Sequence, residues 1–368
     1  MSPIPSVGCA KTHTLRLRRE RWGSTVYDPV TDLYWAFADG PFKGDQRQFD
    51  LGVISEVISG SAVGVRRLQG DEIAHLSTTS PLSFLWSPTQ ICNIGCKYCF
   101  ADDGIFSKYR PTADEFARAL DVVRELKVPR LDFSGGEPFL RRDLLQLVAR
   151  ASETVVPVVT TNGMLVRAEH ARELSHYCSI VQVSLDSADE RTNDSVRGSG
   201  SYKGALAAIK HFRDAGLRVR VFTVVHRANA DELHHLLFLL QREGVVECKF
   251  IKCMPSRTGK SDVALAISSE RFEAAVKDGV ERLRQGTETA KLTVRTLDYD
   301  RDGGGCVILE EDGAVYQMGP SRMRRVGIWR DALDLSSFDY YHYRQHLHYY
   351  VGVHSGWQFY GWEGRADD

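Results

Sequence analysis

CNIGCKYC, residues 92–99, places three cysteines on one short segment with the spacing C-x-x-x-C-x-x-C. The segment follows an apolar run at Ser83–Trp86, which predicts a buried strand. In a parallel α/β barrel, the loop after a strand lies at the catalytic end. Three thiolates on one loop can bind three irons of a 4Fe–4S cluster and leave the fourth iron open. We therefore expect Cys92, Cys96 and Cys99 to hold such a cluster.

Other interpretations of the cysteine triplet stay open at this point. A structural zinc site needs four ligands, usually as two close pairs, and no fourth Cys or His lies near this segment. An electron-transfer cluster also needs four cysteines, so the segment is one short. A chance grouping of buried cysteines is the third possibility. A non-catalytic iron–sulfur or zinc-binding protein therefore remains an alternative.

Outward from the triplet, strand-like and helix-like patterns alternate along the chain. Apolar residues recur at helical spacing between the runs, as at Phe116, Leu120 and Val123. Such alternation predicts β–α units and a parallel sheet. Six units in about 170 residues are too few for a full barrel of ~250 residues, so we predict an α/β fold with a partial (β/α)6 TIM-like barrel at residues 81–255. The predicted strands are Ser83–Trp86, Leu131–Phe133, Val155–Thr160, Ile180–Leu185, Val219–Val225 and Lys249–Ile251.

Two further regions flank the predicted barrel. Residues 1–80 form an N-terminal module, in which alternating runs around Asp28-Pro29 predict a hairpin and Leu51–Ile58 predicts a short helix. Residues 256–368 form a C-terminal α+β extension. It contains a predicted helix at Glu270–Arg284, a predicted hairpin of Val307–Leu309 with Val315–Gln317, and an aromatic tail from Phe338 to Trp362.

Polar motifs follow the later strands of the predicted barrel. The loop after the second strand is Ser134-Gly135-Gly136-Glu137-Pro138, whose glycines allow a close approach to a ligand and whose carboxylate can accept hydrogen bonds from an ammonium group. Thr160–Gly163 and Ser184–Asp186 follow the next two strands. Each motif alone is more often a turn or a helix cap.

In this order, the motifs resemble those of the radical S-adenosylmethionine (SAM) superfamily. The triplet matches its C-x-x-x-C-x-Φ-C signature with Tyr98 as the aromatic residue, and Ser134–Pro138 matches its GGEP motif. The resemblance implies one 4Fe–4S cluster on Cys92, Cys96 and Cys99, with SAM as the second cofactor. It also implies a set of cofactor-binding residues, namely Tyr98, Gly135, Gly136, Glu137, Thr161, Asn162, Ser184, Asp186 and Arg197.

The family's chemistry gives the expected activity. One electron, supplied by an external donor of the flavodoxin or ferredoxin type, cleaves SAM to a 5′-deoxyadenosyl radical. That radical takes a hydrogen atom from the substrate, while the protein supplies binding and orientation. The family resemblance does not identify the substrate, because function lies in the site and not in the fold.

The flanking regions favour a peptide substrate. Residues 305–318 resemble the first hairpin of the SPASM extension of peptide-modifying relatives, but Gln317 and Met318 stand where its second cysteine is expected. We therefore expect a SPASM-like remnant without auxiliary clusters. The N-terminal module resembles leader-binding modules, which take up a peptide as an added strand; a simple cover for the barrel is the alternative.

The predicted substrate is a ribosomally made precursor peptide, modified by cross-linking, thioether formation or epimerisation. A small-molecule enzyme acting on an amino sugar or nucleoside is the rival. An epimerase needs a second hydrogen donor, for which a thiol is suited. Cys253 follows the sixth predicted strand and Cys306 begins the SPASM-like hairpin, so both are candidate catalytic residues, although each is more often a buried structural thiol. Of the two, Cys306 is slightly favoured, because the SPASM resemblance leaves it without a cluster to bind.

Composition excludes several other classes of protein. The chain has 368 residues, with 47 Lys plus Arg against 48 Asp plus Glu. This balance argues against a basic nucleic-acid-binding protein and against an acidic disordered chain. No apolar run approaches the ~18 residues that a membrane helix needs, and the N-terminus has no apolar signal-peptide core. We therefore expect a cytoplasmic protein whose partners include neither nucleic acid nor a membrane.

Overall fold

The structure is a computed structural model that divides into two compact units. One unit comprises Met1–His13 and Pro81–Phe338, and the other comprises Thr14–Ser80 and Asp339–Asp368. The predicted helix at Leu51–Ile58, Cys306 and the aromatic tail before Trp357 lie outside the described residues. The described residues are 16–20, 23–29, 33–38, 65–67, 83–99, 112–253, 263–286, 292–298, 307–309, 314–319, 322–328 and 357–362.

A parallel sheet forms the centre of the larger unit, and its neighbouring strands follow one another in sequence. All six predicted strands are confirmed, with ends shifted by at most two residues. A seventh parallel strand, which we did not predict, comes after residue 255 in the sequence and pairs with the sixth strand at the edge of the sheet. This is the predicted α/β half-barrel. Its strands are β5 (Ser83–Trp86), β6 (Arg130–Phe133), β7 (Val156–Thr161), β8 (Ile180–Ser184), β9 (Arg218–Val225), β10 (Glu247–Lys252) and β11 (Thr293–Leu297).

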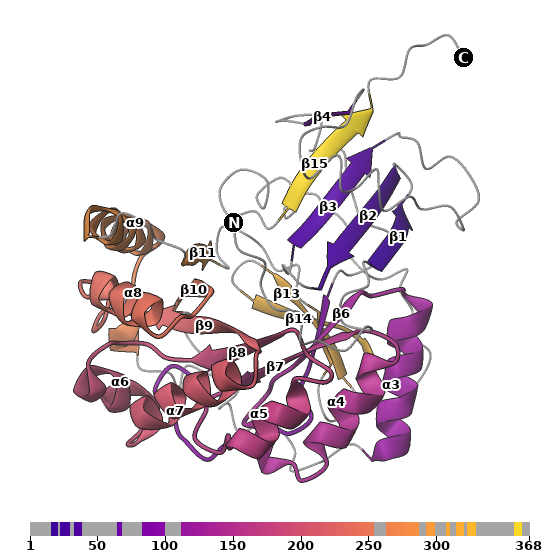
Figure 1. Ribbon diagram of the computed structural model, residues 1–368, viewed down its shortest axis with the longest axis horizontal. Helices are drawn as coiled ribbons and strands as arrows, with labels where there is room; N and C mark the ends of the chain where they lie inside the picture. The colour runs from indigo at the N-terminus through magenta and orange to yellow at the C-terminus, as the bar shows by residue number, and fades with distance from the viewer. Residues whose placement is uncertain are drawn as a thin grey trace. The chain divides into compact units, whose positions relative to one another are not determined.

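Helices connect these strands and, in Figure 1, α3 to α8 line one side of the sheet. The first shows why they form where they do: Thr112 and Glu115 make a reciprocal capping box, and Phe116, Leu120 and Val123 are buried along one face. No described helix is long and apolar enough to cross a bilayer. The helices are α3 (Ala113–Glu125), α4 (Leu144–Ser152), α5 (Ala168–Leu174), α6 (Glu190–Arg197), α7 (Ser201–Asp214), α8 (Leu233–Arg242) and α9 (Ser269–Gly286), with short 3₁₀ turns η1 (Pro138–Leu140) and η2 (Val263–Leu265).

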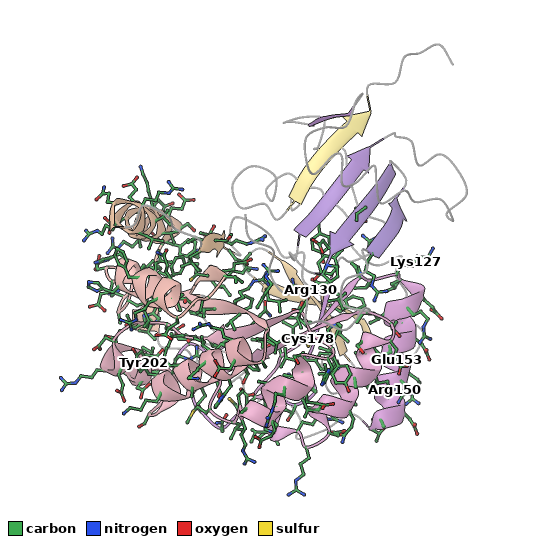
Figure 2. The ribbon with its side chains drawn as sticks, viewed as in Figure 1. Lys127, Arg130, Arg150, Glu153, Cys178 and Tyr202 are labelled. Atoms are coloured by element: carbon green, nitrogen blue, oxygen red, sulfur yellow. The ribbon has the colours of Figure 1, made fainter. Side chains whose placement is uncertain are left out.

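The two faces of the sheet differ in composition. On β9, Val219, Val221 and Val225 are fully buried on one face, and Arg220 and Phe222 alternate with them on the other. The valine face meets the helices, which gives the core. Arg130 at the start of β6 and Cys178 just before β8 are labelled in Figure 2 and lie at the amino-terminal ends of their strands. The polar motifs lie at the opposite, carboxyl-terminal ends.

The predicted hairpin in the C-terminal region is confirmed and joins the same sheet. β12 (Val307–Leu309) pairs antiparallel with β13 (Ala314–Gly319), which pairs with β14 (Arg322–Ile328). β12 also pairs in parallel with β5, so that Val307 lies beside Phe84. The sheet of the larger unit therefore extends past the predicted boundary at residue 255.

The smaller unit contains a second sheet, with strand order β1-β2-β3-β15-β4. The predicted N-terminal hairpin is confirmed as β2 (Gly23–Asp28) paired with β3 (Leu33–Ala38), and β1 (Arg16–Glu20) pairs with β2. The last described strand, β15 (Trp357–Trp362), pairs in parallel with β3 and antiparallel with β4 (Val65–Arg67). The N-terminal strands thus share one sheet with the end of the chain, so the predicted boundary at residue 80 does not enclose the whole unit.

Candidate functional site

The GGEP loop lies directly against the backbone that leads to the cysteine triplet. The Gly136 N–H donates to Thr89 O at 2.8 Å, and the Glu137 N–H donates to Ile91 O at 2.9 Å. A Cβ added at Gly136 would stand 2.3 Å from Ile91 O, and one at Gly135, where φ is +104°, would stand 2.5 Å from Thr89 O. The close approach that we predicted toward a ligand is therefore made here toward the chain's own backbone.

The cysteine loop is also tied to α6 and to the end of β7. The Lys97 N–H donates to Val196 O at 2.9 Å, and the Cys96 sulfur lies 3.6 Å from Arg197 O. The Asn162 amide nitrogen lies 3.8 Å from the sulfur of Cys92. These contacts come from two neighbouring strand–helix units, so the fold itself fixes the course of the loop.

The three sulfurs suit an iron–sulfur cluster. Cys92 is exposed, and Cys96 and Cys99 are half-buried. Burial raises the pKa of the Cys92 thiol and raises that of Cys96 to about 12, so binding iron as thiolates would release protons. Within the described residues, no three His, Cys, Asp or Glu side chains gather closely enough for a single metal ion. In a cluster, by contrast, each thiolate binds a different iron, and soft sulfur ligands are the donors that it requires.

Glu137 connects the GGEP loop to the end of β7. Its carboxylate is fully buried and accepts hydrogen bonds from the Asn162 N–H at 2.8 Å, the Thr161 hydroxyl at 2.8 Å and the Phe139 N–H at 3.1 Å. Burial raises the pKa of Glu137, and these three bonds oppose that rise. Thr161 in turn accepts from the Gly163 N–H at 3.0 Å. The carboxylate thus organises the chain itself, and its binding of a ligand ammonium group stays a prediction.

Tyr98, Asp186 and Arg197 form a second buried network. The Tyr98 hydroxyl donates to the Asp186 carboxylate, and Arg197 Nη1 lies 2.5 Å from the Tyr98 oxygen and 3.4 Å from Asp186 Oδ2. The Val224 N–H donates to the other Asp186 oxygen at 2.9 Å. Ser184 ends β8 and is half-buried. These bonds hold the cysteine loop, through Tyr98, against the carboxyl ends of β8 and β9.

One polar residue of this edge escaped the sequence analysis. His226 is the first residue after β9, is fully buried, and its ring lies 5.9 Å from that of Tyr98, centroid to centroid. The sequence offered one clue, which is that His226 stands directly after a strand, as the predicted motifs do after the preceding strands. No motif marks His226, and it lies one residue beyond the strand predicted at Val219–Val225.

The two candidate thiols differ in what can be said of them. Cys253 directly follows β10, is 3% exposed, and clusters with Val196 and Leu265, against which Tyr98 also packs. Its backbone therefore reaches the same edge as the cysteine triplet. Cys306 lies outside the described residues; the next residue, Val307, begins β12. That strand starts beside Phe84, near the amino-terminal end of β5.

The sequence matches known proteins over part of its length. Residues 86–240 match the sequence model of the radical SAM superfamily. Fe-coproporphyrin III synthase of Methanosarcina barkeri is 31% identical over 60% of this chain and 56% of its own length. Mycofactocin maturase MftC of Mycolicibacterium smegmatis is 32% identical over 49% of this chain and 46% of its own length. The chain thus spans about half the length of these curated relatives.

Solved structures share the fold over a longer part of the chain. Streptococcus suis SuiB bound to S-adenosylmethionine superposes with a TM-score of 0.66, covering 90% of this chain and 88% of SuiB at 14% identity. The protein anSMEcpe with bound AdoMet gives a TM-score of 0.59, covering 70% of this chain and 81% of its own at 18% identity. At these identities the likeness shows the fold alone.

Proposed function

We propose, from the match of residues 86–240 to the radical SAM superfamily, that the protein is an enzyme that binds one 4Fe–4S cluster through Cys92, Cys96 and Cys99 and cleaves SAM reductively. The observation that carries the proposal is the cysteine loop itself. Three thiols on one short loop are held at the carboxyl edge of a parallel sheet by backbone bonds to α6 and to the GGEP loop. That edge is where α/β folds build active sites.

The chain's residues divide into two roles in this proposal. A cluster held by Cys92, Cys96 and Cys99 would supply the electron for the reductive cleavage of SAM, the step that leads to hydrogen abstraction from the substrate in this family. Glu137, Thr161 and Asn162 hold the end of β7 against the cysteine loop, and Asp186 holds Tyr98. Ser184 and Arg197 offer polar atoms to the cofactor.

The experiment is anaerobic reconstitution with iron and sulfide, followed by an assay for 5′-deoxyadenosine in the presence of SAM and a reductant. We expect about four irons per chain, because the three cysteines would hold a single 4Fe–4S cluster. Cys92→Ala, Cys96→Ala and Cys99→Ala should each lose the iron and the product, since three anchors cannot share the loss of one. Cys178→Ala is the matched control, because Cys178 is buried before β8 at the other end of the sheet. About eight irons per chain would contradict the single-cluster assignment.

We propose a precursor peptide as the substrate class. Two similar proteins support it: one relative is named as a mycofactocin maturase, and SuiB has been solved bound to the precursor peptide SuiA. The smaller unit adds a physical argument, since β1 (Arg16–Glu20) is an edge of its sheet among the described strands. A leader peptide can bind such an edge as an added strand.

A small-molecule substrate, such as an amino sugar or nucleoside, is the second candidate. The observation in its favour is the similarity to Fe-coproporphyrin III synthase, whose name does not describe a peptide-modifying enzyme. Mass spectrometry of reactions with candidate peptides, each with and without its leader, separates the two. A mass change that requires the leader supports the peptide, and turnover of a small molecule without any peptide supports the rival. In either case we propose that a flavodoxin- or ferredoxin-type protein supplies the electron.

A further inference from the structure

His226 lies where the predicted cofactor site and the cysteine loop meet. It follows β9 at the carboxyl edge of the sheet and packs beside Tyr98, which lies between Cys96 and Cys99 in the sequence. The side chain is fully buried, with 0% of its surface exposed. A polar ring in such a place needs partners for both of its nitrogens or loses hydrogen bonds to water without replacement.

One ring nitrogen has a partner that fixes the tautomer. The Ala228 N–H donates to His226 Nδ1 at 3.2 Å, so Nδ1 is an acceptor and carries no proton. Burial lowers the pKa of His226, which favours the neutral ring. The proton of the neutral ring is therefore on Nε2, which makes that atom a hydrogen-bond donor.

The backbone around His226 is equally fixed. The His226 N–H donates to the side-chain oxygen of Asn229 at 2.8 Å, and the Asn229 amide nitrogen donates to Asp186 O at 2.8 Å and to Val224 O at 2.9 Å. Asn229 thus joins the start of the loop after β9 to the end of β8. The imidazole is held in place by contacts that leave Nε2 unused.

The Nε2 donor has no hydrogen-bond partner among the described residues, although it is buried. Arg197 Nε is a second buried donor without a hydrogen-bond partner among the described residues. It belongs to the guanidinium that bonds Tyr98. A buried donor left without an acceptor is costly, and native structures rarely keep one without a reason. Two such donors, each on a side chain that contacts Tyr98, indicate that the acceptors come from a bound molecule.

We propose that His226 Nε2–H donates a hydrogen bond to bound SAM, which makes His226 a cofactor-binding residue. This inference rests on the proposed function. In the family's chemistry the amino and carboxylate groups of SAM are engaged by the open iron, so the acceptors that remain are the ribose oxygens and the ring nitrogens of adenine. A neutral imidazole donor, fixed by Ala228 and Asn229, is suited to such uncharged acceptors.

The test compares SAM binding by the cluster-reconstituted full chain, without any substrate, in variants that separate the donor from the ring. His226→Phe keeps an aromatic ring beside Tyr98 and removes the donor, so its dissociation constant for SAM should rise about two- to tenfold. His226→Gln places an amide N–H near the position of Nε2 and should restore affinity to within about twofold of the wild type. His235→Phe, at an exposed histidine of α8, is the matched control and should bind as the wild type does.

Thermal unfolding without SAM supplies a readout that a purely structural role would move. His226→Phe removes the unpaired Nε2 donor and also the Nδ1 acceptor of the Ala228 N–H, so its cofactor-free melting temperature should change little, while the increase produced by SAM should shrink. Equal SAM affinity of the wild type and His226→Phe would overturn the inference. An equal SAM-induced increase in melting temperature in the wild type and in His226→Phe would overturn it as well. If the wild type holds four irons and still binds no SAM, the proposed function fails first and this inference falls with it.

Discussion

Single residues at the carboxyl edge of the sheet can bind other parts of the chain and can bind a ligand. Their sequence motifs do not distinguish these two roles. The sequence predicts Glu137 as an acceptor for a ligand ammonium group. In the structure its carboxylate already accepts from Thr161, Asn162 and Phe139. A carboxylate has about four acceptor positions, so one remains for a ligand. Glu137 can therefore contribute both to the stability of the protein and to its affinity for the cofactor, and the two contributions have to be separated.

Glu137→Ala separates these roles. It leaves two backbone N–H groups and one hydroxyl buried without their acceptor, so the free energy of unfolding of the cofactor-free protein should fall by about 2–4 kcal/mol. Chemical denaturation measures this directly. Glu137→Gln, which keeps the volume and one acceptor oxygen, is the control and should lose less. Unchanged stability combined with a SAM affinity weakened ten- to hundredfold would instead give the carboxylate the direct ligand role predicted from the sequence.

At the scale of elements, the contact between the GGEP loop and residues 87–91 fixes where the cysteine loop begins. Gly136→Ala tests this contact, because its Cβ would stand 2.3 Å from Ile91 O and 2.6 Å from the Gln90 carbonyl carbon. Neither backbone atom can move without shifting the chain that leads to Cys92.

We expect Gly136→Ala to fold less stably, by about 2 kcal/mol or more, and to bind less than the wild-type amount of iron after reconstitution. Gly95→Ala is the matched control, since a Cβ there meets nothing within 4 Å and its effect on stability should be small. Full iron content in Gly136→Ala would show that the loop does not depend on this contact.

One face of the sheet carries a belt of buried charged side chains toward the amino ends of its strands. Arg220 and Arg295 both form ion pairs with Glu247, at 2.6 and 3.1 Å, and Arg220 also donates to Gln182 at 3.0 Å. The amine of Lys249 lies 5.6 Å from the centre of the Phe222 ring. Burial, followed by the charges of Arg220 and Arg130, lowers the pKa of Lys249 to about 8.

The lowered pKa of Lys249 allows us to predict how the stability of the protein changes with pH. An unfolded lysine titrates near 10.5, so between pH 8 and pH 10.5 the unfolded chain binds more protons than the folded one, and stability from this group rises with pH. Below pH 8 both states are protonated, and the unfavourable position of the folded ammonium acts in full. Lys249→Met should therefore raise the melting temperature at pH 7 by about 2–4 °C, with the gain shrinking as the pH approaches 10.5.

Thermal unfolding at a series of pH values checks this prediction. Lys277→Met, on the exposed side of α9 and paired only loosely with Glu281 at 3.9 Å, is the control and should show no such pH dependence. A destabilised Lys249→Met protein at pH 7 would mean that the ammonium is stabilised by its surroundings.

At the scale of the whole molecule, short sequence patterns predicted the individual strands and helices but not the pairing of distant segments. The six strands and the helices between them have clear periodicity, and the cysteine triplet marked the correct edge of the sheet. The seventh strand, β11 (Thr293–Leu297), has five residues and no strong apolar run, so only its pairing with β10 defines it. The pairing of β12 with β5 and of β15 with β3 joins segments more than two hundred residues apart, which no local pattern encodes. His226 was missed for a related reason, because its significance lies in its neighbours.

The assembled sheet also bears on which reaction the enzyme completes. An epimerase must return a hydrogen atom to the opposite face of the substrate radical, and a thiol S–H bond is weak enough to supply it. The transfer leaves a sulfur radical, which the external electron donor reduces and a solvent proton restores to the thiol. Cys253 directly follows β10 at the same edge as the cysteine triplet, whereas Cys306 lies outside the described residues. Cys253 is therefore the candidate that the described part of the sheet supports.

Reaction in D₂O distinguishes this outcome by product mass and connectivity. Because the thiol exchanges with solvent, epimerisation incorporates one solvent deuterium without a change in connectivity, and Cys253→Ala should abolish that incorporation while still forming 5′-deoxyadenosine. Cys306→Ala is the comparison variant and should keep the label if Cys253 alone is the donor. Since Cys253 is buried with Val196 and Leu265, Cys253→Ser, which keeps the volume but has a stronger O–H bond, checks that lost packing is not the cause. A product two mass units lighter, formed equally by all these variants, would exclude a thiol donor, because cross-linking and dehydrogenation remove a second hydrogen and return none.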